Sequence, residues 1–384
     1  MAKQIFISSG DFSGDIHASA LIKSIGQDKF NNDIPEKKIV TGLGGEKMRQ
    51  ACDVFLADTL SIEGFGLNGL YKKYKFFKNL LDNKIKIYFE LNRPDLIILV
   101  DFYGFNIHIA EYAKQFSIPV VYYISPQVYA SREYRVKKIK KYVDKVICIF
   151  PFEQKLYARY SMETEYFGNP LVDIIQQKIR TNNCNALIEK YKGLNLIGIM
   201  PGSRKSELES LLLPMLNIIK ISKVYKKAKI LVFAAGSLER SSIEHICQLS
   251  GIIDYIDIID GDNYALRTKL MFCLTASGTI TVENAILGLP MIIMYKLPWL
   301  TFKIIKAIVK VKYIGMPNIL AEKEILPEYV QIIDEDKIAL KVIDWVDNPD
   351  KLFLVKQSLL TIKNMIGQPG VIDKAAKTCL SFIR

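Results

Sequence analysis

Short apolar runs alternate with longer amphipathic stretches along most of this chain. The pattern predicts parallel strands separated by helices, because a strand covered on both faces is apolar throughout, whereas a covering helix is apolar on one side. The predicted strands are Gln4–Ser8, Lys38–Thr41, Leu96–Val100, Val120–Tyr123 and Lys145–Phe150, followed by Leu196–Met200, Ile230–Ala234, Ile256–Ile259, Met271–Thr275 and Met291–Met294. Two series of strands predict an α/β protein with two Rossmann-like, doubly wound domains.

The chain has 384 residues, which suits two domains of ordinary size. Gly168–Pro170 follows the first series of strands, and a polar stretch, Thr181–Asn185, precedes the second. We therefore expect an N-terminal domain over residues 1–172, a C-terminal domain over 173–350, and helices over 351–384. Ligands of such folds bind outside the carboxyl ends of the strands or in the cleft between domains, so the site is expected there.

Composition and charge narrow the class of protein. Six cysteines lack the paired spacing of a zinc site or a disulfide framework, which fits a reducing cytosol. The N-terminal segment does not resemble a secretory signal, and no apolar run in the sequence approaches the ~20 residues of a membrane helix. A net charge of +12 and a pI near 9.1 favour an anionic partner. Since no nucleic-acid-binding motif accompanies the charge, an acidic lipid or a phosphorylated substrate is expected.

The clearest candidate for phosphate binding is the loop Pro201–Glu207, which joins a predicted strand to a helical run from Leu208. The start of a helix presents unpaired N–H groups to an anion, and Arg204 can grip two phosphate oxygens. We expect a diphosphate at Gly202, Ser203 and Arg204. The alternative is a Pro-Gly turn with a serine as the helix cap and the arginine in a surface ion pair.

A second loop of the same kind, Ala276–Thr279, begins the helix that carries Glu283. The small residues Ser277, Gly278 and Thr279 suit a close approach of a ligand to the backbone. Glu283 lies about one turn later, where its carboxylate can accept both hydroxyls of a ribose. A glutamate in a first helical turn also compensates the helix dipole, but that alternative does not explain the small residues.

In the first half of the chain, the loop Ser8–Asp15 also joins a strand to a helix. Asp11 and Asp15 would repel phosphate, so hydroxyl groups are the better ligands for this loop. Asp101 follows the strand Leu96–Val100, a position typical of catalytic carboxylates. The alternative for Asp101 is a cap of the next helix.

Two stretches, Tyr71–Leu81 and Trp299–Val311, mix lysines with aromatic residues at helical spacing. Such helices can lie on an anionic lipid surface. Lysine stems that surround an ordinary core helix give the same pattern, which is the alternative. Asp334–Asp336 looks like a metal-binding Asp-x-Asp but is better explained as a helix cap, so neither a metal nor a cofactor is predicted.

Seven segments follow one another over nearly the whole chain, from the first loop to about Val330. They are Gly10–Asp15, Ser125–Val128, Phe150–Glu153, Gly168–Leu171, Leu196–Arg204, Ala276–Thr279 and Met316–Leu320. Together and in this order they resemble the lipid-A-disaccharide synthase family. The ordered set is far more specific than any one of its members.

The resemblance implies a glycosyltransferase B architecture: an acceptor-facing N-terminal half, a half that binds a UDP-sugar, and C-terminal helices that cross back or exchange between subunits. The implied reaction is inverting. It joins UDP-2,3-diacylglucosamine and 2,3-diacylglucosamine 1-phosphate into a β-1,6-linked disaccharide 1-phosphate and releases UDP. Because both substrates are anionic lipids, we expect a cytoplasmic protein that is peripheral on the inner membrane. The resemblance also implies that it uses no metal, cofactor or nucleic acid. The resemblance also allows a homodimer.

The resemblance directs the search for the general base. Gly104 stands where the family often has a candidate catalytic Asp, so Asp101 is the first candidate here and Asp11, where the family commonly has Glu, is the second. Tyr129 and Ser131 stand where tryptophans are frequent, which bears on the fit of acyl chains or acceptor.

The resemblance also assigns the binding residues. By motif match Glu283 holds the ribose, and Asn318 contacts the nucleotide or the donor. Arg204 and the amides of Ser277–Thr279 stabilise the departing diphosphate. The full set expected to bind substrate is Ser13, Gly14, Ser125, Gln127, Asn169, Gly202, Ser203, Arg204, Ser277, Gly278, Thr279, Glu283 and Asn318.

Two other functions fit part of the sequence. A nonhydrolysing UDP-N-acetylglucosamine 2-epimerase would share the two domains and the UDP pocket, but its soluble substrate needs no basic aromatic helices. A non-catalytic peripheral membrane protein would leave Asp101, Arg204 and Glu283 without a role.

Overall fold

The computed structural model describes residues 2–27, 37–61, 66–129, 132–181, 185–236, 238–299, 302–303 and 312–383. The chain forms two compact units. Unit 1 comprises Met1–Ile174 and Gly367–Arg384, and unit 2 comprises Ile175–Ile366. The chain therefore leaves unit 1 once and returns to it once.

Unit 1 is built on a seven-stranded parallel sheet with the strand order β3-β2-β1-β4-β5-β6-β7. The central strand β4 is buried at every position, as expected of a strand with helices on both faces. The strands are β1 (Lys3–Ser8), β2 (Lys38–Gly44), β3 (Val54–Asp58), β4 (Leu96–Val100), β5 (Val120–Tyr123), β6 (Lys145–Cys148) and β7 (Thr164–Tyr166).

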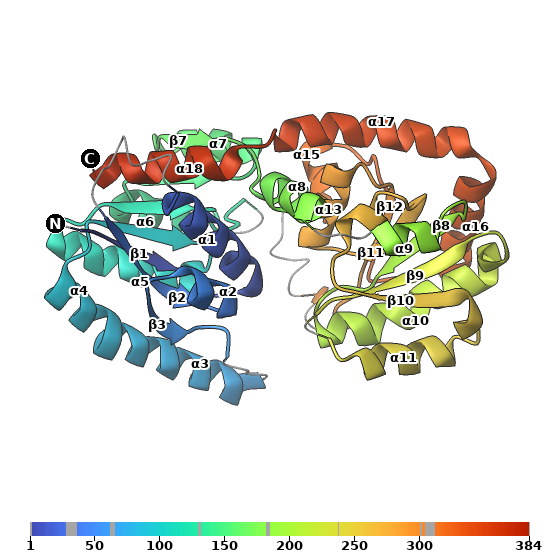
Figure 1. Ribbon diagram of the computed structural model, residues 1–384, viewed down its shortest axis with the longest axis horizontal. Coiled ribbons are helices and arrows are strands. Elements are labelled where there is room, and N and C mark those ends of the chain that lie inside the picture. The colour runs from blue at the N-terminus through green and yellow to red at the C-terminus, as the bar shows by residue number, and fades with distance from the viewer. Residues whose placement is uncertain are drawn as a thin grey trace. The chain divides into compact units, whose positions relative to one another are not determined.

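Helices flank this sheet (Figure 1). A π-helical turn, Leu81–Ile85, joins α3 to α4, and a 3₁₀ turn, Lys114–Phe116, follows α5. The helices of unit 1 are α1 (Phe12–Ile25), α2 (Glu46–Ala51), α3 (Gly66–Leu80), α4 (Lys86–Asn92), α5 (Tyr103–Ala113), α6 (Arg135–Tyr142), α7 (Pro151–Ala158) and α18 (Val371–Leu380), and α8 (Leu171–Thr181) begins in unit 1 and ends in unit 2.

The last helix, α18, packs against the first, α1 (Figure 1). Asp173 accepts hydrogen bonds from the backbone N–H groups of Gly370 (2.6 Å) and Ile372 (2.8 Å), which would otherwise lack partners at the start of α18. Ser24 of α1 donates to Asp373 (2.7 Å). Residues from the two ends of the chain thus belong to one core.

Unit 2 has a six-stranded parallel sheet with the order β10-β9-β8-β11-β12-β13. The strands are β8 (Leu196–Met200), β9 (Lys229–Ala234), β10 (Ile256–Asp260), β11 (Phe272–Ala276), β12 (Met291–Tyr295) and β13 (Glu328–Val330). The helices are α9 (Asn185–Lys190), α10 (Lys205–Ser222), α11 (Arg240–Leu249), α12 (Tyr264–Arg267), α13 (Thr279–Leu287), α15 (Met316–Ala321), α16 (Glu335–Asp347) and α17 (Pro349–Ile366), with 3₁₀ turns at Val224–Lys226, Ile253–Tyr255 and, in unit 1, Ser381–Ile383.

The predicted fold class is confirmed, because six strands in each unit follow the order 3-2-1-4-5-6 when numbered within the unit. The order reverses between β1 and β4 in unit 1 and between β8 and β11 in unit 2. Loops at such a reversal leave a crevice at the carboxyl ends of the strands, where ligands of doubly wound folds bind.

The residues expected to form C-terminal helices, 351–384, are divided between the units. Residues 351–366 lie in α17, which packs on α13 and α15 of unit 2, whereas α18 belongs to unit 1. Asp334 caps α16 by accepting a hydrogen bond from the N–H of Lys337 (3.0 Å), as the cap interpretation predicts. In the parts of the chain that the structure describes, no helix is both long and apolar enough to span a bilayer.

Candidate active site

Asp101 and Phe102 form a strained turn at the carboxyl end of β4. Both residues adopt left-handed backbone conformations, with φ of 44° and 46°, which non-glycine residues avoid. The side chain of Asn106 donates to the carbonyls of Val100 (3.1 Å) and Asp101 (2.9 Å), and the Tyr122 hydroxyl also donates to the carbonyl of Asp101 (2.6 Å). These bonds hold the turn and with it the Asp101 carboxyl group.

The turn contacts the loop that follows β1. A methyl group on Gly10 would lie 2.1 Å from the ring of Phe102, so only glycine fits there. Ser8, at the end of β1, donates to Asn106 (2.8 Å). The two loops at the strand reversal of unit 1 are therefore packed together, and this places Asp11 close enough to Asp101 for their charges to interact.

Asp101 is poised to exchange a proton near neutral pH. Burial, and after it the negative charge of Asp11, raises the pKa of Asp101 to about 7, although the amide of Phe102 and the charge of Arg135 act in the opposite direction. A carboxylate with a pKa near the working pH is well suited to general base catalysis.

The two aspartates of the first loop have different partners. Asp11 caps α1 by accepting a hydrogen bond from the N–H of Gly14 (2.6 Å), beside the half-buried Ser13. Asp15 is buried and accepts three backbone hydrogen bonds, from Gly45 (2.8 Å), Lys47 (3.1 Å) and Met48 (3.0 Å). Asp15 thus organises the start of α2, and Asp11 is the loop carboxylate that faces Asp101.

A hydrogen bond connects Ser125, in the loop that follows β5, to Glu153. The hydroxyl of Ser125 donates to the buried carboxyl group of Glu153 (3.2 Å), which also accepts from the backbone N–H groups of Ile149 and Phe150 (both 3.0 Å). Burial raises the pKa of Glu153 to about 7 despite these bonds. Gln127 lies on the same loop and is exposed. Ser125 therefore orders the loop, and Gln127 remains available to a ligand.

Asn169 is buried, and its side-chain oxygen accepts a hydrogen bond from the N–H of Leu171 (3.0 Å) at the start of α8. Asn318 is also buried. It donates to the carbonyl of Leu326 (2.8 Å) and to Glu328 (2.7 Å) and accepts from the backbone of Ile325 and Leu326. Both side chains hold backbone segments in this structure, and both side-chain N–H donors of Asn318 are used.

The loop after β8 has the expected strand–turn–helix geometry. Gly202 has a φ of 108°, which favours glycine, and Arg204 is the N-cap of α10. Glu207 accepts hydrogen bonds from the backbone N–H groups of Ser203 (3.0 Å) and Arg204 (3.2 Å), and from the guanidinium of Arg204 (2.7 Å). An internal carboxylate therefore occupies the donors that were predicted to bind phosphate. The Arg204 side chain is 75% exposed and borders a cavity of about 410 Å³ that Tyr295 also lines.

The loop after β11 leaves its donors open. Gly278 has a φ of 147°, and apart from its two chain neighbours no described residue has an atom within 4 Å of where its Cβ would be. Gly278 and Thr279 are exposed at the start of α13, and within the described chain neither of their backbone N–H groups has an acceptor. The Ser277 hydroxyl donates to the carbonyl of Ile314 (3.2 Å). An exposed helix start with free N–H groups is suited to an anion.

Glu283 is held by a buried arginine that the sequence analysis missed. Arg267, 2% exposed, donates to Glu283 (2.8 Å) and to the side-chain oxygen of Asn284. The guanidinium of Arg267 also lies over the ring of Tyr264, 4.9 Å from its centroid. Arg267 thus fixes one carboxylate oxygen of Glu283.

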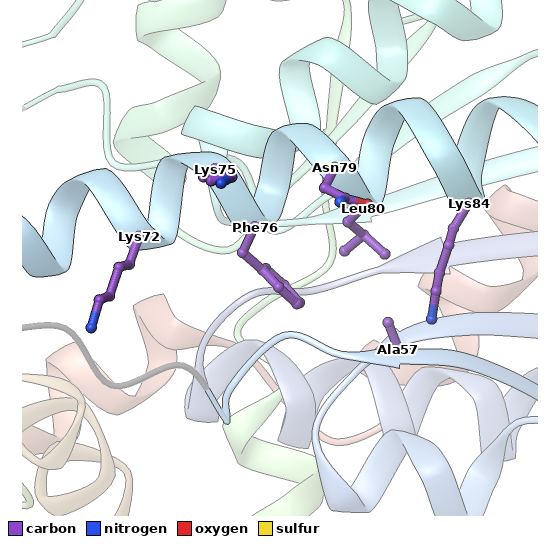
Figure 2. A pocket seen from close by; sticks show the side chains of 7 residues that line it. All are labelled: Ala57, Lys72, Lys75, Phe76, Asn79, Leu80 and Lys84. Carbon is purple, nitrogen blue, oxygen red and sulfur yellow. The ribbon is translucent and has the colours of Figure 1, made fainter.

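A basic groove lies between α3 and β3 of unit 1 (Figure 2). Its cavity has a volume of about 410 Å³. Figure 2 shows the side chains of Phe76, Leu80 and Ala57 pointing into the space, with Lys72 and Lys84 on either side of it. Most of the second lysine–aromatic stretch, Trp299–Val311, lies outside the described residues, as does Ser131.

No group of three or more His, Cys, Asp or Glu side chains in the described ranges is arranged to hold a metal ion. Among the described residues, Asp101 has a carboxyl group with a raised pKa, and the loops after β8 and β11 each lead into the start of a helix.

The comparisons of the sequence with known proteins identify one family. Residues 5–375 match the family model described as lipid-A-disaccharide synthetase. The chain is 33% identical to the lipid-A-disaccharide synthase of Persephonella marina, with 97% of each chain covered, and 31% identical to that of Sulfurihydrogenibium sp., again with 97% of each covered.

Solved structures share the fold at low sequence identity. A UDP-N-acetylglucosamine 2-epimerase from Neisseria meningitidis bound to UDP-N-acetylglucosamine has a TM-score of 0.63 at 13% identity, covering 100% of this chain and 99% of its own. A glycosyltransferase from Rickettsia africae has a TM-score of 0.58 at 11% identity, covering 100% and 99%. These similarities establish the architecture, while the family match over nearly the whole sequence assigns the chemistry: the chain belongs to the lipid-A-disaccharide synthase family of glycosyltransferases.

Proposed function

We propose that this glycosyltransferase joins UDP-2,3-diacylglucosamine and 2,3-diacylglucosamine 1-phosphate into a β-1,6-linked disaccharide 1-phosphate and releases UDP. The family match supports lipid A disaccharide synthesis. The observation that carries the finer proposal is Asp101, a carboxyl group with a pKa near 7 on a strained turn at the strand reversal of unit 1.

In this proposal Asp101 is the general base. It takes the proton of the acceptor 6-hydroxyl while that oxygen forms a bond to the anomeric carbon of the donor, and the bond from this carbon to the diphosphate breaks. One displacement from the opposite face inverts the anomeric centre. Asp11 raises the proton affinity of Asp101 and so makes it a stronger base at neutral pH.

Unit 2 holds the donor. The free N–H groups of Gly278 and Thr279 and the exposed guanidinium of Arg204 bind the diphosphate, and they stabilise the charge that develops on it as the bond breaks. When the diphosphate binds, the guanidinium of Arg204 leaves Glu207 and contacts the diphosphate. Glu207 keeps its hydrogen bonds to the backbone. Glu283, oriented by Arg267, accepts the ribose hydroxyls.

The protein works on lipids at the cytoplasmic face of the inner membrane. The net charge of +12 and the groove beside α3 support this part of the proposal, because exposed Lys72 and Lys75 border an apolar floor. Tyr71 and Tyr74, 67% and 63% exposed, place aromatic rings on the same helix, as is common at a membrane interface.

The test uses the full chain in detergent with both lipid substrates and EDTA, and follows disaccharide and UDP. We expect both products in equal amounts. If UDP binds but no disaccharide forms, the acceptor assignment is wrong. Conversion of UDP-N-acetylglucosamine alone, without any acceptor, would identify an epimerase instead.

A further inference from the structure

Arg135 lies beside the Asp101 turn, and the fold of unit 1 does not explain why an arginine stands at this position. It is the first residue of α6, where the positive end of the helix dipole opposes a cation. The central carbon of its guanidinium lies over the ring of Tyr103, 4.3 Å from the centroid. Since Tyr103 follows Asp101 by two residues, this stacking fixes the arginine next to the proposed base.

The side chain of Arg135 forms no hydrogen bond with any residue that the structure describes. Its Nε is fully enclosed and has no hydrogen-bond partner, which is costly for a buried polar group. Within the described ranges no carboxylate forms an ion pair with its guanidinium. By contrast, Arg159, Arg204 and Arg267 each contact a glutamate at 3.0 Å or less. An arginine that is held in place, but whose donors are unused, is suited to an anion from outside the protein.

The position of Arg135 relative to Asp101 limits which anion Arg135 is suited to bind. The charge of Arg135 lowers the pKa of Asp101, so the two groups are near each other, yet they form no ion pair. The acceptor substrate carries its phosphate on C1 and its reactive hydroxyl on C6, attached at the two ring positions that flank the ring oxygen of the sugar. The side chains that bind the phosphate and the hydroxyl must therefore be neighbours that do not contact each other, as Arg135 and Asp101 are.

We propose that Arg135 binds the phosphate monoester of the acceptor, so that the fork of its guanidinium selects a sugar 1-phosphate and sets the distance of the acceptor hydroxyl from Asp101. The inference rests on the proposed function, because it concerns the acceptor of that reaction. Its ligand is a phosphate monoester on an acylated sugar, and the planar guanidinium offers two parallel N–H donors to two phosphate oxygens.

The test compares two acceptors, 2,3-diacylglucosamine 1-phosphate and 2,3-diacylglucosamine without phosphate, in the wild type, R135A, R135K and the control R159A. Arg159 is exposed and pairs with Glu133, so R159A removes the same charge elsewhere on unit 1. We expect R135A to raise the KM for the phosphorylated acceptor about 10- to 100-fold, leave the KM for the donor unchanged, and abolish the preference for the phosphorylated acceptor. R135K should restore part of that preference, since it keeps the charge but not the fork.

Two outcomes would overturn the inference. One is that R135A slows both acceptors by the same factor. The other is that it shifts only the pH dependence and preserves the preference, which would mean that Arg135 acts solely on Asp101. Binding of each acceptor in detergent micelles, measured without donor, provides a readout that does not require turnover. If the wild type forms no disaccharide yet prefers the phosphorylated acceptor in this binding assay through Arg135, the proposed reaction fails while the inference stands.

Discussion

The carboxylate of Glu207 lies 2.7 Å from the guanidinium of Arg204, in the loop after β8 that was predicted to bind phosphate. Glu207 also accepts from the backbone N–H of Arg204 (3.2 Å), so a negative charge of the protein already occupies these donors. A diphosphate that binds to this loop, as we propose, would therefore compete with Glu207 for the exposed arginine.

Replacing Arg204 should therefore weaken the binding of UDP. Charge-assisted hydrogen bonds contribute about 1.5–3 kcal/mol, so R204A should raise the Kd about 10- to 100-fold, and R204K should lie between R204A and the wild type. Isothermal titration with UDP measures the effect. R240A, which removes an exposed arginine paired with Glu244, is the control and should bind UDP like the wild type. Equal affinity of R204A and wild type would exclude Arg204 from the site.

Asp101→Asn should abolish most of the turnover while UDP binding persists. Removing a general base typically costs about 10²–10⁴-fold in rate, and the amide is isosteric with the carboxyl group. The rate of disaccharide formation and the Kd of UDP are the two measurements. A folded D101N protein with near-normal turnover would rule Asp101 out as the base.

The pH dependence of kcat/KM should show the influence of Asp11 on Asp101. The base must be ionised, and the pKa of Asp101 is raised to about 7, so the rate should fall as the pH drops below this value. D11N removes the negative neighbour, lowers the pKa of Asp101, and should move the acid limb to lower pH. The Asn side chain can still accept from Gly14, which preserves the cap of α1. An unmoved acid limb in D11N would contradict the coupling.

Arg267→Gln should destabilise unit 2. Breaking a buried ion pair leaves an uncompensated carboxylate and costs about 3–5 kcal/mol, and Glu283 is only 15% exposed. Chemical denaturation followed by tryptophan fluorescence reports the loss, because Trp345 is in the core of this unit. R240Q removes the exposed ion pairs of Arg240 with Glu244 and Asp260 and should change stability little. Similar losses in the two variants would show that Arg267 contributes no more than a surface charge.

Removing the lysines that border the α3 groove should weaken membrane binding. Each lysine near an anionic surface contributes about 1 kcal/mol, so K72Q/K75Q should lower the partition coefficient about 30-fold on vesicles that contain phosphatidylglycerol. Turnover in detergent should not change. K192Q/K205Q removes two exposed lysines of unit 2 and is the matched control. Equal partitioning of both double variants would place the membrane contact elsewhere.

The buried strands could be predicted from the sequence, and three edge strands could not. β4 and β8 are continuous apolar runs because both faces of each are covered. β3, β7 and β13 are edge strands of their sheets, and none of their residues is fully buried. A half-exposed strand of three to five residues has too little apolar periodicity to be recognised.

The loops of the candidate site were recognisable because each follows a predicted strand. The groups that position them were not. Arg267 meets Glu283 across 16 residues of sequence, and Ser125 meets Glu153 across 28. Arg135 lies over the ring face of Tyr103, and no local sequence pattern encodes this contact. Such contacts arise from tertiary packing, so a single sequence reveals the residue types but not the pairs.

The return of the chain to unit 1 has a consequence for synthesis on the ribosome. Residues 175–366 emerge as one uninterrupted segment and contain every strand of unit 2, so this unit can fold as soon as it is translated. Unit 1 begins first but lacks α18 until residues 175–366 have been translated. Its first helix then lacks its partner α18, whose buried residues include Val371, Ala375 and Cys379. The unit encoded first is thus completed last, and a ribosome that stalls before α18 leaves an apolar surface of unit 1 open to chaperones.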